Sequence, residues 1–251
     1  MAIRAYWFRW LENYGDKLTP WIVHKLTGEL PEFAPASDRC LKLVSVGSIL
    51  NHVRQHCVVW GTGMMSRADI ADSRADYRAV RGPLTARQIS SQGGRAPEVF
   101  GDPGLLLPRW IVRSPVMYRV GIVPHYVHYE EALRRWSGGD ALVVDVRGEV
   151  EEVVKQITSC ECIVSSSLHG LVTACAYGLP HARLKFSKPI GGDGSKFRDF
   201  YQGIGARLPP VIDCVCRTPI PEQLAEKVAE APVCNVDDLW EACPIEQLAS
   251  G

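Results

Sequence analysis

The chain has 251 residues, of which 46% are hydrophobic and 22% are charged, and a chain of this length forms one large domain or two of about 100–130 residues each. Lysine and arginine total 28, as do aspartate and glutamate, so no net charge favours binding of nucleic acid. No apolar run reaches the roughly 18 residues of a membrane span, and the first residues lack the apolar core of a secretory signal.

The N-terminal half predicts two buried strands and two helices. The aromatic residues 6–10 predict a short packed helix, with contact to a membrane as the alternative. Residues 41–50 and 56–65 are apolar, rich in β-branched side chains and broken by glycine, as is typical of buried parallel strands. Residues 81–94 predict a helix that has Pro83 in its first turn and ends at two glycines.

After a breaker-rich segment at 101–110, strands and helices alternate through the C-terminal half. The predicted strands lie at 118–125, 141–148, 161–167 and 181–187, and the predicted helices at 129–137, 149–160, 168–178 and 221–230. This alternation is typical of βαβ units that build a parallel sheet.

We therefore predict an α/β protein with two Rossmann-like domains that face each other across a cleft. The domains span residues 1–115 and 116–215, with the boundary near 111–117, and residues 216–251 form a helical tail. Ligands of open α/β sheets bind beyond the carboxyl ends of the strands, so we expect the binding site in the cleft.

The nine cysteines are scattered, and several lie inside apolar runs, where cysteine behaves as a small hydrophobic residue. Two C-x-C pairs occur, Cys160/Cys162 and Cys214/Cys216, but paired zinc ligands usually stand about two to four residues apart. Without a secretory signal, we expect reduced thiols in a cytoplasmic protein and no metal site.

The run from Cys160 to Pro180 predicts a strand, a serine-rich turn and a helix that opens with His169. The first N–H groups of a helix lack internal partners and carry partial positive charge, so this turn suits an anion. An imidazole beside an anion indicates proton transfer. The alternative is a helix-start histidine that bonds only to the backbone.

Other candidates lie at the ends of predicted strands. His125 ends the first strand of the C-terminal half, on the same rim as His169, and Arg81 stands at a strand-to-helix turn where an oxyanion clamp is plausible. The loop Gly61-Thr62-Gly63 follows a strand as ligand-facing loops do, but it is no dinucleotide motif. For His125 and Arg81, the alternative is simple solvation.

Two further segments carry charged candidates. Asn13 and Asp16 form a tight turn before a helix, where Asp16 either orients or deprotonates a hydroxyl or only caps the helix. The basic, glycine-broken stretch 183–200 includes Lys185 and Lys196 and predicts a mobile loop that closes on an anion, or else a solvated face.

Eight segments in order resemble one known family, the polysaccharide pyruvyl transferases, in particular the members that add pyruvate ketals to bacterial exopolysaccharide repeat units. The segments are NYGDKLTPWIVHKLTG (13–28), VGSIL (46–50), VWGTGMM (59–65), VRGPLTAR (80–87), GDPGLLLP (101–108), GIVPHYV (121–127), SSSLHGLVTACAYGLP (165–180) and KFRDFY (196–201).

The resemblance implies a fold like that of two-domain GT-B glycosyltransferases. It also implies phosphoenolpyruvate as donor, a lipid-linked sugar as acceptor and no cofactor or metal. By this likeness, His169 matches the histidine proposed as general acid and Arg81 matches a donor-binding arginine. Some relatives carry an arginine two residues before the histidine, where this chain has Ser167. Either Lys185 or Lys196 supplies that charge instead, or the anion site is weaker.

With this chemistry, the candidates divide by role. We expect His169 and, less directly, Asp16 to be catalytic, the C-terminal domain to bind the donor and the N-terminal domain to bind the acceptor. The donor set is Arg81, His125, Ser166, Ser167, Leu168, Lys185 and Lys196, and the acceptor set is Asn13, Gly61, Thr62 and Gly63.

Two other functions stay open. One is a GT-B-like glycosyltransferase that uses a nucleotide sugar, and the other is a non-catalytic, sugar-binding component of polysaccharide assembly. For a lipid-linked acceptor, we expect a cytoplasmic protein with peripheral contact to the inner face of the plasma membrane and no binding of nucleic acid.

Overall fold

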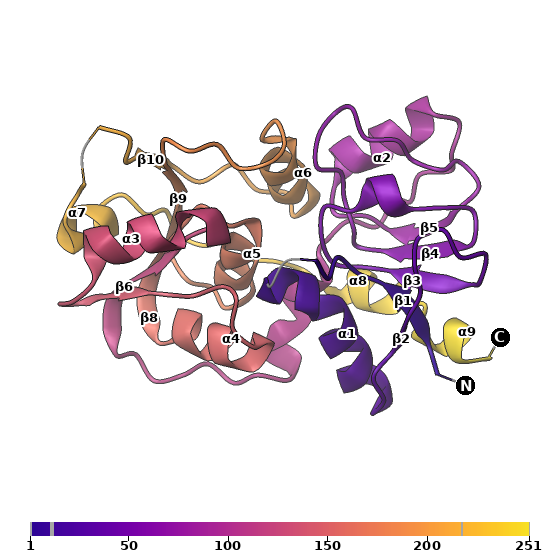
Figure 1. The fold of residues 1–251 in the computed structure, drawn as a ribbon, viewed down its shortest axis with the longest axis horizontal. Coiled ribbons are helices and arrows are strands. Elements are labelled where there is room, and N and C mark those ends of the chain that lie inside the picture. The colour runs from indigo at the N-terminus through magenta and orange to yellow at the C-terminus, as the bar shows by residue number, and fades with distance from the viewer. Residues whose placement is uncertain (1, 11–12, 217, 251) are drawn as a thin grey trace.

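Two parallel sheets of five strands each make up the fold (Figure 1). The computed structural model describes residues 2–10, 13–216 and 218–250. The strand orders are β2-β1-β3-β4-β5 in the N-terminal sheet and β10-β9-β8-β6-β7 in the C-terminal sheet. Helices connect the strands of the C-terminal sheet and some of those in the N-terminal sheet, so the predicted α/β class with parallel, Rossmann-like sheets is confirmed.

The N-terminal sheet includes a strand where the sequence predicts a helix. Its strands are β1 (Arg4–Tyr6), β2 (Glu32–Phe33), β3 (Lys42–Val44), β4 (Cys57–Trp60) and β5 (Asp76–Ala79). β3 and β4 confirm the two predicted strands. The helix predicted for residues 6–10 is wrong: Tyr6 ends β1, where Ala5 and Tyr6 pair in parallel register with Leu43 and Val44 and are buried, and residues 7–10 form neither helix nor strand. Sheet pairing and burial thus outweigh local preference.

The helices of the N-terminal half are α1 (Tyr14–Thr27), α2 (Pro83–Ser91) and the short 3₁₀ helices η1 (Leu50–His52) and η2 (Pro103–Arg109). The side chain of Asn13 caps α1 by accepting from the N–H of Gly15. Asp16 therefore lies in the first turn of α1, and the alternative that Asp16 only caps the helix is wrong. Gly28, with φ of 80°, ends α1 in the left-handed conformation.

The C-terminal half follows the predicted alternation closely. Its strands are β6 (Tyr118–Val123), β7 (Ala141–Val143), β8 (Cys160–Ser165), β9 (His181–Lys185) and β10 (Val211–Asp213), and its first helices are η3 (Tyr126–His128), α3 (Tyr129–Trp136), α4 (Val150–Thr158) and α5 (Leu168–Ala176). Among the described strands of this half, only the edge strand β10 has no counterpart in the prediction, because it is short and lacks a long apolar run.

Part of the predicted mobile loop is a helix, α6 (Ser195–Gly203). Phe197, Phe200 and Tyr201 recur at helical spacing and pack with residues of α5 in one buried cluster. Figure 1 shows α6 beside α2 of the N-terminal half. The prediction of a loop across this segment is therefore wrong. The lysine and arginine residues made the segment read as polar, whereas its aromatic residues form an apolar helix face that the tertiary structure buries.

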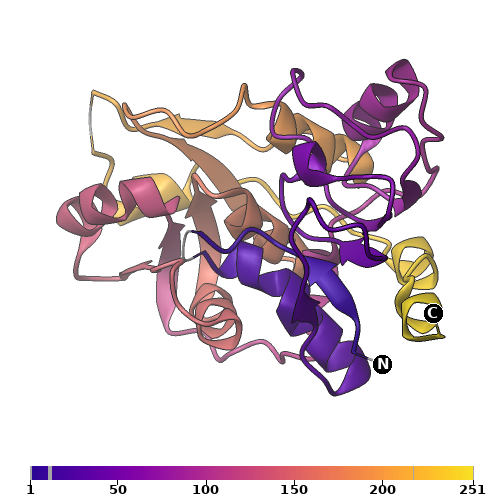
Figure 2. The same cartoon turned by 45° about the vertical axis from the view of Figure 1, so that its right-hand side comes forward.

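The tail returns to the N-terminal sheet. Helix α7 (Pro221–Ala225) is shorter than the predicted helix 221–230. Ala229 instead forms an antiparallel β-bridge with His181 through two backbone hydrogen bonds, so the helix ends before it. The helices α8 (Asp237–Glu241) and α9 (Ile245–Ser250) lie beside the N-terminal sheet in Figure 2. There, Trp60 donates its indole N–H to the carbonyl of Leu239 at 2.8 Å. Among the described residues, no helix is both long and apolar enough to cross a membrane.

Candidate functional site

A cavity of about 340 Å³ lies among loops that follow strands of both sheets. We call it the His169 cavity. Its walls are formed by Phe8, Asn13, Asp16, Ser48, Ile49, Asn51, His52, Met65, His125, Tyr126, Ser167, Leu168, His169 and Lys196. The cavity therefore combines α1 and the loop after β3 with the strand-to-helix turn of β8 and α5, at the carboxyl ends where such sheets bind ligands.

His169 stands in the first turn of α5 and is only 6% exposed. Its Nε2 lies 3.6 Å from Oδ2 of the fully buried Asp102, and its ring meets the ring of Tyr14 edge-on. Among the described residues, no hydrogen bond joins this imidazole to the backbone, which argues against a purely structural histidine. Asp102 is a residue that the sequence analysis missed, and its only signal is its place in the GDPG segment.

The strand-to-helix turn leaves backbone donors available. The hydroxyl of Ser165 accepts from the N–H of Ser167, which fixes the turn. The first intrahelical bond of α5 runs from the N–H of Leu171 to the carbonyl of Ser167. Within the described chain, the N–H groups of Leu168 and His169 have no acceptor, so they are free to bind an anion.

Asp16 faces the same cavity from α1. Burial raises the pKa of its carboxyl from 3.8 to about 6, while the charge of His169, a hydrogen bond from Asn13 and the charge of Lys196 oppose this effect. A carboxyl with this pKa is ionised at neutral pH and can still accept a proton, as a general base must.

Lys196 and His125 are two further titratable residues of the cavity. Lys196 is 5% exposed, and its ammonium forms no hydrogen bond or ion pair with any described residue. Burial and the nearby charge of Arg81 lower its pKa to about 8, against the attraction of Asp16. Burial, Lys196 and His128 lower the pKa of His125 to about 4, so His125 is neutral at physiological pH. Lys196 is thus a buried cation without an anionic partner among the described residues, and it is suited to bind an anionic ligand.

Arg81 does not line the cavity but lies directly behind it. Its guanidinium donates to Oγ of Ser48 at 2.9 Å and to the carbonyl of Met64, and it lies 3.2 Å from Oδ2 of Asp199. Gly63 makes room for this side chain, since a Cβ there would approach Cζ to 2.5 Å. Ser48 is the residue through which Arg81 reaches the cavity.

Several other predicted residues lie outside the His169 cavity. Lys185 is exposed and pairs with Asp213 at 2.8 Å, and together with Ser166 it borders a separate hollow of about 320 Å³. Thr62 is buried and donates to the carbonyl of Gly47, and Gly61 packs against Pro103. Their proposed roles in donor and acceptor binding receive no support from these positions.

The first sheet supplies cavity residues that the sequence analysis gave no role. Ser48, Asn51 and His52 line the cavity from the segment after β3. The available signal was position alone, because this segment directly follows a buried strand that ends at glycine. Loops at the carboxyl ends of parallel strands meet at one edge, whichever side chains they carry.

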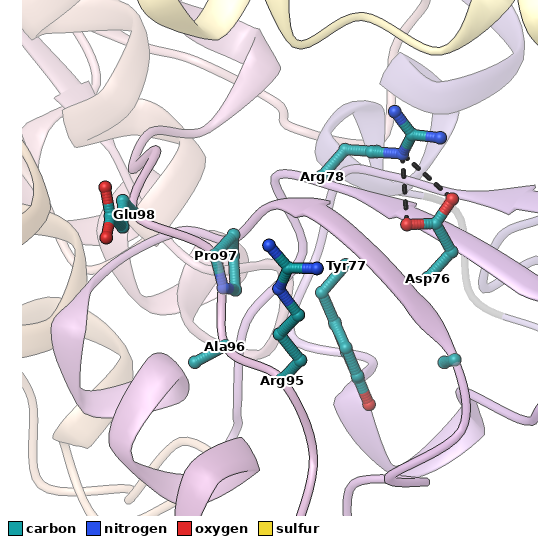
Figure 3. A pocket seen from close by; sticks show the side chains of 8 residues that line it. Asp76, Tyr77, Arg78, Arg95, Ala96, Pro97 and Glu98 are labelled. Atoms are coloured by element: carbon teal, nitrogen blue, oxygen red, sulfur yellow. Dashed lines mark hydrogen bonds and ion pairs between the residues drawn. The ribbon is translucent and has the colours of Figure 1, made fainter.

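A larger hollow of about 610 Å³ lies elsewhere, beside the edge strand β5 (Figure 3). Two of its four charged residues pair with each other, since Nε of Arg78 donates to both carboxylate oxygens of Asp76 at 3.0 and 2.8 Å. Tyr77 turns its hydroxyl to the carbonyl of Asp72. The residues around it include no histidine, so the His169 cavity is the stronger candidate for proton-transfer chemistry.

Comparison with known proteins agrees with the geometry. The family model of polysaccharide pyruvyl transferases matches residues 2–185. The chain belongs to this family. Among its relatives, the succinoglycan biosynthesis protein ExoV of Rhizobium meliloti (strain 1021) is 32% identical over 220 residues, which cover 82% of this chain and 66% of that protein.

An uncharacterized protein of Acanthamoeba polyphaga mimivirus is also similar to this chain. It is 30% identical over 169 residues, which cover 64% of this chain and 59% of the viral protein. The chain thus spans slightly less than two thirds of the length of either relative. A crystal structure of a functionally uncharacterized protein from Klebsiella pneumoniae is similar with a TM-score of 0.47 and 8% identity, covering 80% of this chain and 87% of that one.

Proposed function

We propose that this protein transfers pyruvate from phosphoenolpyruvate to a sugar of an exopolysaccharide repeat unit, forming a pyruvate ketal and releasing phosphate. One observation carries the proposal. In a chain of the pyruvyl transferase family, one cavity contains His169, the unpaired Lys196 and the free N–H groups at the start of α5. This set suits a small substrate with several negative charges that must also be protonated.

The donor makes specific demands that these groups meet. Phosphoenolpyruvate carries a phosphate and a carboxylate, and each requires cationic or N–H partners. Lys196, Leu168 and His169 line one cavity, so the ammonium of Lys196 and the N–H groups at the start of α5 can share the two anionic groups. Lys196, rather than Lys185, is in position to replace the arginine that some relatives carry at Ser167, because Lys185 is engaged with Asp213 at the surface.

The proposed reaction begins with proton transfer from His169 to the methylene carbon of phosphoenolpyruvate, which becomes a methyl group. The central carbon is then electrophilic, and a sugar hydroxyl attacks it while Asp16 accepts the hydroxyl proton. Phosphate leaves with cleavage of the carbon–oxygen bond, and a second hydroxyl closes the ketal. Of the two hydroxyl protons, one restores His169 and one leaves on phosphate. General acid–base catalysis of this kind contributes about 10²–10⁴ in rate.

The acceptor would approach from the N-terminal half. We propose that the two sheets act as donor and acceptor domains of a GT-B-like enzyme, and that the acceptor sugar is lipid-linked. Asn13 and Phe8 line the cavity from the N-terminal half, and Trp10, two residues after Phe8, is 65% exposed. An exposed tryptophan whose ring centroid lies 5.4 Å from that of the cavity residue Phe8 suits peripheral contact with the cytoplasmic face of a membrane, where such an acceptor resides.

The decisive experiment incubates the purified protein with phosphoenolpyruvate and candidate lipid-linked oligosaccharides. The expected product is an oligosaccharide heavier by one pyruvate ketal in mass spectrometry, with one phosphate released per ketal. Thermal-shift titration compares phosphoenolpyruvate with nucleotide sugars, since a ligand stabilises the native state by RT ln(1 + [L]/Kd). Stabilisation by a nucleotide sugar alone would indicate a glycosyltransferase, and acceptor binding without phosphate release would indicate a non-catalytic component.

A further inference from the structure

Two buried polar atoms face each other at the base of the His169 cavity. Oδ2 of Asp102 and Nε2 of His169 are both inaccessible to solvent and both lack a hydrogen-bond partner within the described chain. They are 3.6 Å apart. The other carboxylate oxygen of Asp102 is already engaged, because Oδ1 accepts from the N–H of Gly104 at 2.9 Å and caps η2.

With Asp102 ionised, only one proton arrangement satisfies both atoms. A carboxylate oxygen accepts hydrogen bonds and donates none, so Nε2 of His169 must carry the hydrogen that points at Oδ2. Leaving both groups unpaired in the interior would forfeit the hydration of each without compensation. A contraction of a few tenths of an ångström brings the pair into ordinary hydrogen-bond distance.

The second ring nitrogen of His169 faces the start of α1. A Cβ built on Gly15 would lie 2.0 Å from Nδ1, so this nitrogen packs against the backbone of Gly15. Gly15 is the residue before Asp16 in α1. The neighbour Tyr14 is held in place by its own hydrogen bond to Thr173, at 3.1 Å. Nδ1 is therefore the ring nitrogen beside the start of α1, the helix that carries Asp16, and any side chain at position 15 would displace it.

We propose that Asp102 is a positioning residue that fixes the proton of neutral His169 on Nε2, so that Nδ1 is the atom that exchanges a proton with substrate. The tautomer follows from the geometry together with an ionised Asp102, whereas its role in pyruvyl transfer rests on the proposed function. In the reaction, the imidazolium donates its Nδ1 proton to the methylene carbon and retains Nε2–H toward Asp102 throughout. The same division of labour between a buried carboxylate and a histidine occurs in serine proteases.

The tautomer is measurable without any substrate. Long-range ¹⁵N–¹H spectra of the whole protein, labelled on histidine, distinguish protonated from bare ring nitrogens, and His169→Gln identifies the signals of His169. We expect Nε2 protonated and Nδ1 bare in the neutral ring of the wild-type protein. A protonated Nδ1 in the wild-type protein would overturn the proposal.

The substitution Asp102→Asn separates the positioning of His169 from the capping of η2, which Asp102 also provides. The amide oxygen can still accept from the N–H of Gly104, which turns the NH₂ group toward His169 and makes Nε2 an acceptor. We expect the proton to move to Nδ1, whereas Asp76→Asn at a surface ion pair leaves the His169 signals unchanged. An unchanged tautomer in folded Asp102→Asn protein refutes the assignment. Should that variant fail to fold, Gly15→Ala is the second test, and an unchanged ring environment there refutes it equally.

The catalytic part is tested separately. With phosphoenolpyruvate and an acceptor that the wild-type protein pyruvylates, Asp102→Asn should lower kcat by roughly 10²–10⁴-fold. The Kd for phosphoenolpyruvate, measured by thermal-shift titration, should change by less than about threefold, because the anion-binding groups are intact. A switched tautomer with unchanged kcat contradicts the role of Nδ1 in the reaction. Absence of pyruvyl transfer in the wild-type protein contradicts the proposed function and leaves the spectroscopic result standing.

Discussion

Arg81 and Asp199 form a fully buried ion pair, with Nη2 and Oδ2 3.2 Å apart. The pair joins the turn before α2 to α6, the helix that carries Lys196. Asp199 also accepts from the N–H groups of Leu84 and Thr85 and from the hydroxyl of Thr85, so it caps α2 from another part of the chain. The position of Lys196 therefore depends on contacts behind the cavity.

We expect Asp199→Ala to reduce the free energy of unfolding by about 3–5 kcal/mol, because it leaves Arg81 as an uncompensated buried charge. Urea denaturation measures the change. As the matched control, Asp213→Ala breaks the exposed pair with Lys185 and should leave the urea midpoint nearly unchanged. Equal effects of the two substitutions would show that the buried pair has no special structural role.

Arg81→Ala should weaken phosphoenolpyruvate binding as well as stability. The guanidinium holds Ser48 at the cavity wall and anchors α6, so its loss disturbs the donor partners more than the acceptor side. Affinity for phosphoenolpyruvate is measured by thermal-shift titration at a temperature where the variant is folded. A variant with wild-type affinity for phosphoenolpyruvate argues against any part for Arg81 in donor binding.

We expect His169→Gln to lower pyruvyl transfer by at least about 10²-fold while the protein stays folded, because the variant lacks the proton donor. Phosphate release in the presence of acceptor measures the rate, and circular dichroism checks the fold. His24→Gln, which changes an exposed histidine on α1, is the control and should retain activity. Near wild-type activity in His169→Gln would remove His169 from the mechanism.

Substitutions of Lys196 and Lys185 should affect phosphoenolpyruvate binding differently. Lys196→Met should raise the Kd for phosphoenolpyruvate by roughly 10–100-fold, since hydrogen bonds to charged groups contribute about 1.5–3 kcal/mol. Lys185→Met should leave the Kd unchanged, because its ammonium pairs with Asp213 outside the cavity. The reverse pattern would assign the missing arginine charge to Lys185. Adding Ser167→Arg to the Lys196→Met protein tests whether a cation at the position used by relatives restores binding.

The ionised form of Asp16 should destabilise the folded protein. Burial raises its folded pKa from 3.8 to about 6, so the native state binds the proton more tightly than the unfolded state. Stability contributed by the protonated carboxyl is present below about pH 4 and is lost as the pH rises through about 6. Asp16→Asn should therefore raise the free energy of unfolding at pH 7 by roughly 1–3 kcal/mol and reduce activity.

Urea denaturation at several pH values measures this effect. The difference between Asp16→Asn and the wild-type protein should shrink toward zero near pH 4, where both side chains are neutral. In activity assays, the wild-type rate should fall as the pH drops through about 6, where the proposed base becomes protonated. A stability difference that is the same at pH 4 and pH 7 would mean that the charge of Asp16 is not its cause.

The sequence by itself determined the features that depend on near neighbours. Apolar runs and helical periodicity predicted β3, β4, β6, β8 and α2 to α5, and the Cys160–Pro180 run predicted the strand, turn and helix that carry His169. Ordered motifs also predicted the family that the comparisons confirm. Each of these signals lies within about 20 residues of chain, which is the range of strand, turn and helix preferences.

Only the tertiary structure decided which distant side chains meet. Asp102 lies beside His169, Lys196 enters the cavity while Lys185 stays outside, and Arg81 is buried against Asp199 instead of facing the ligand. Tyr6 joined a strand and the end of the basic stretch became part of helix α6 for the same reason. Burial against partners far along the chain outweighs local preference, and no local pattern records which partner will be there.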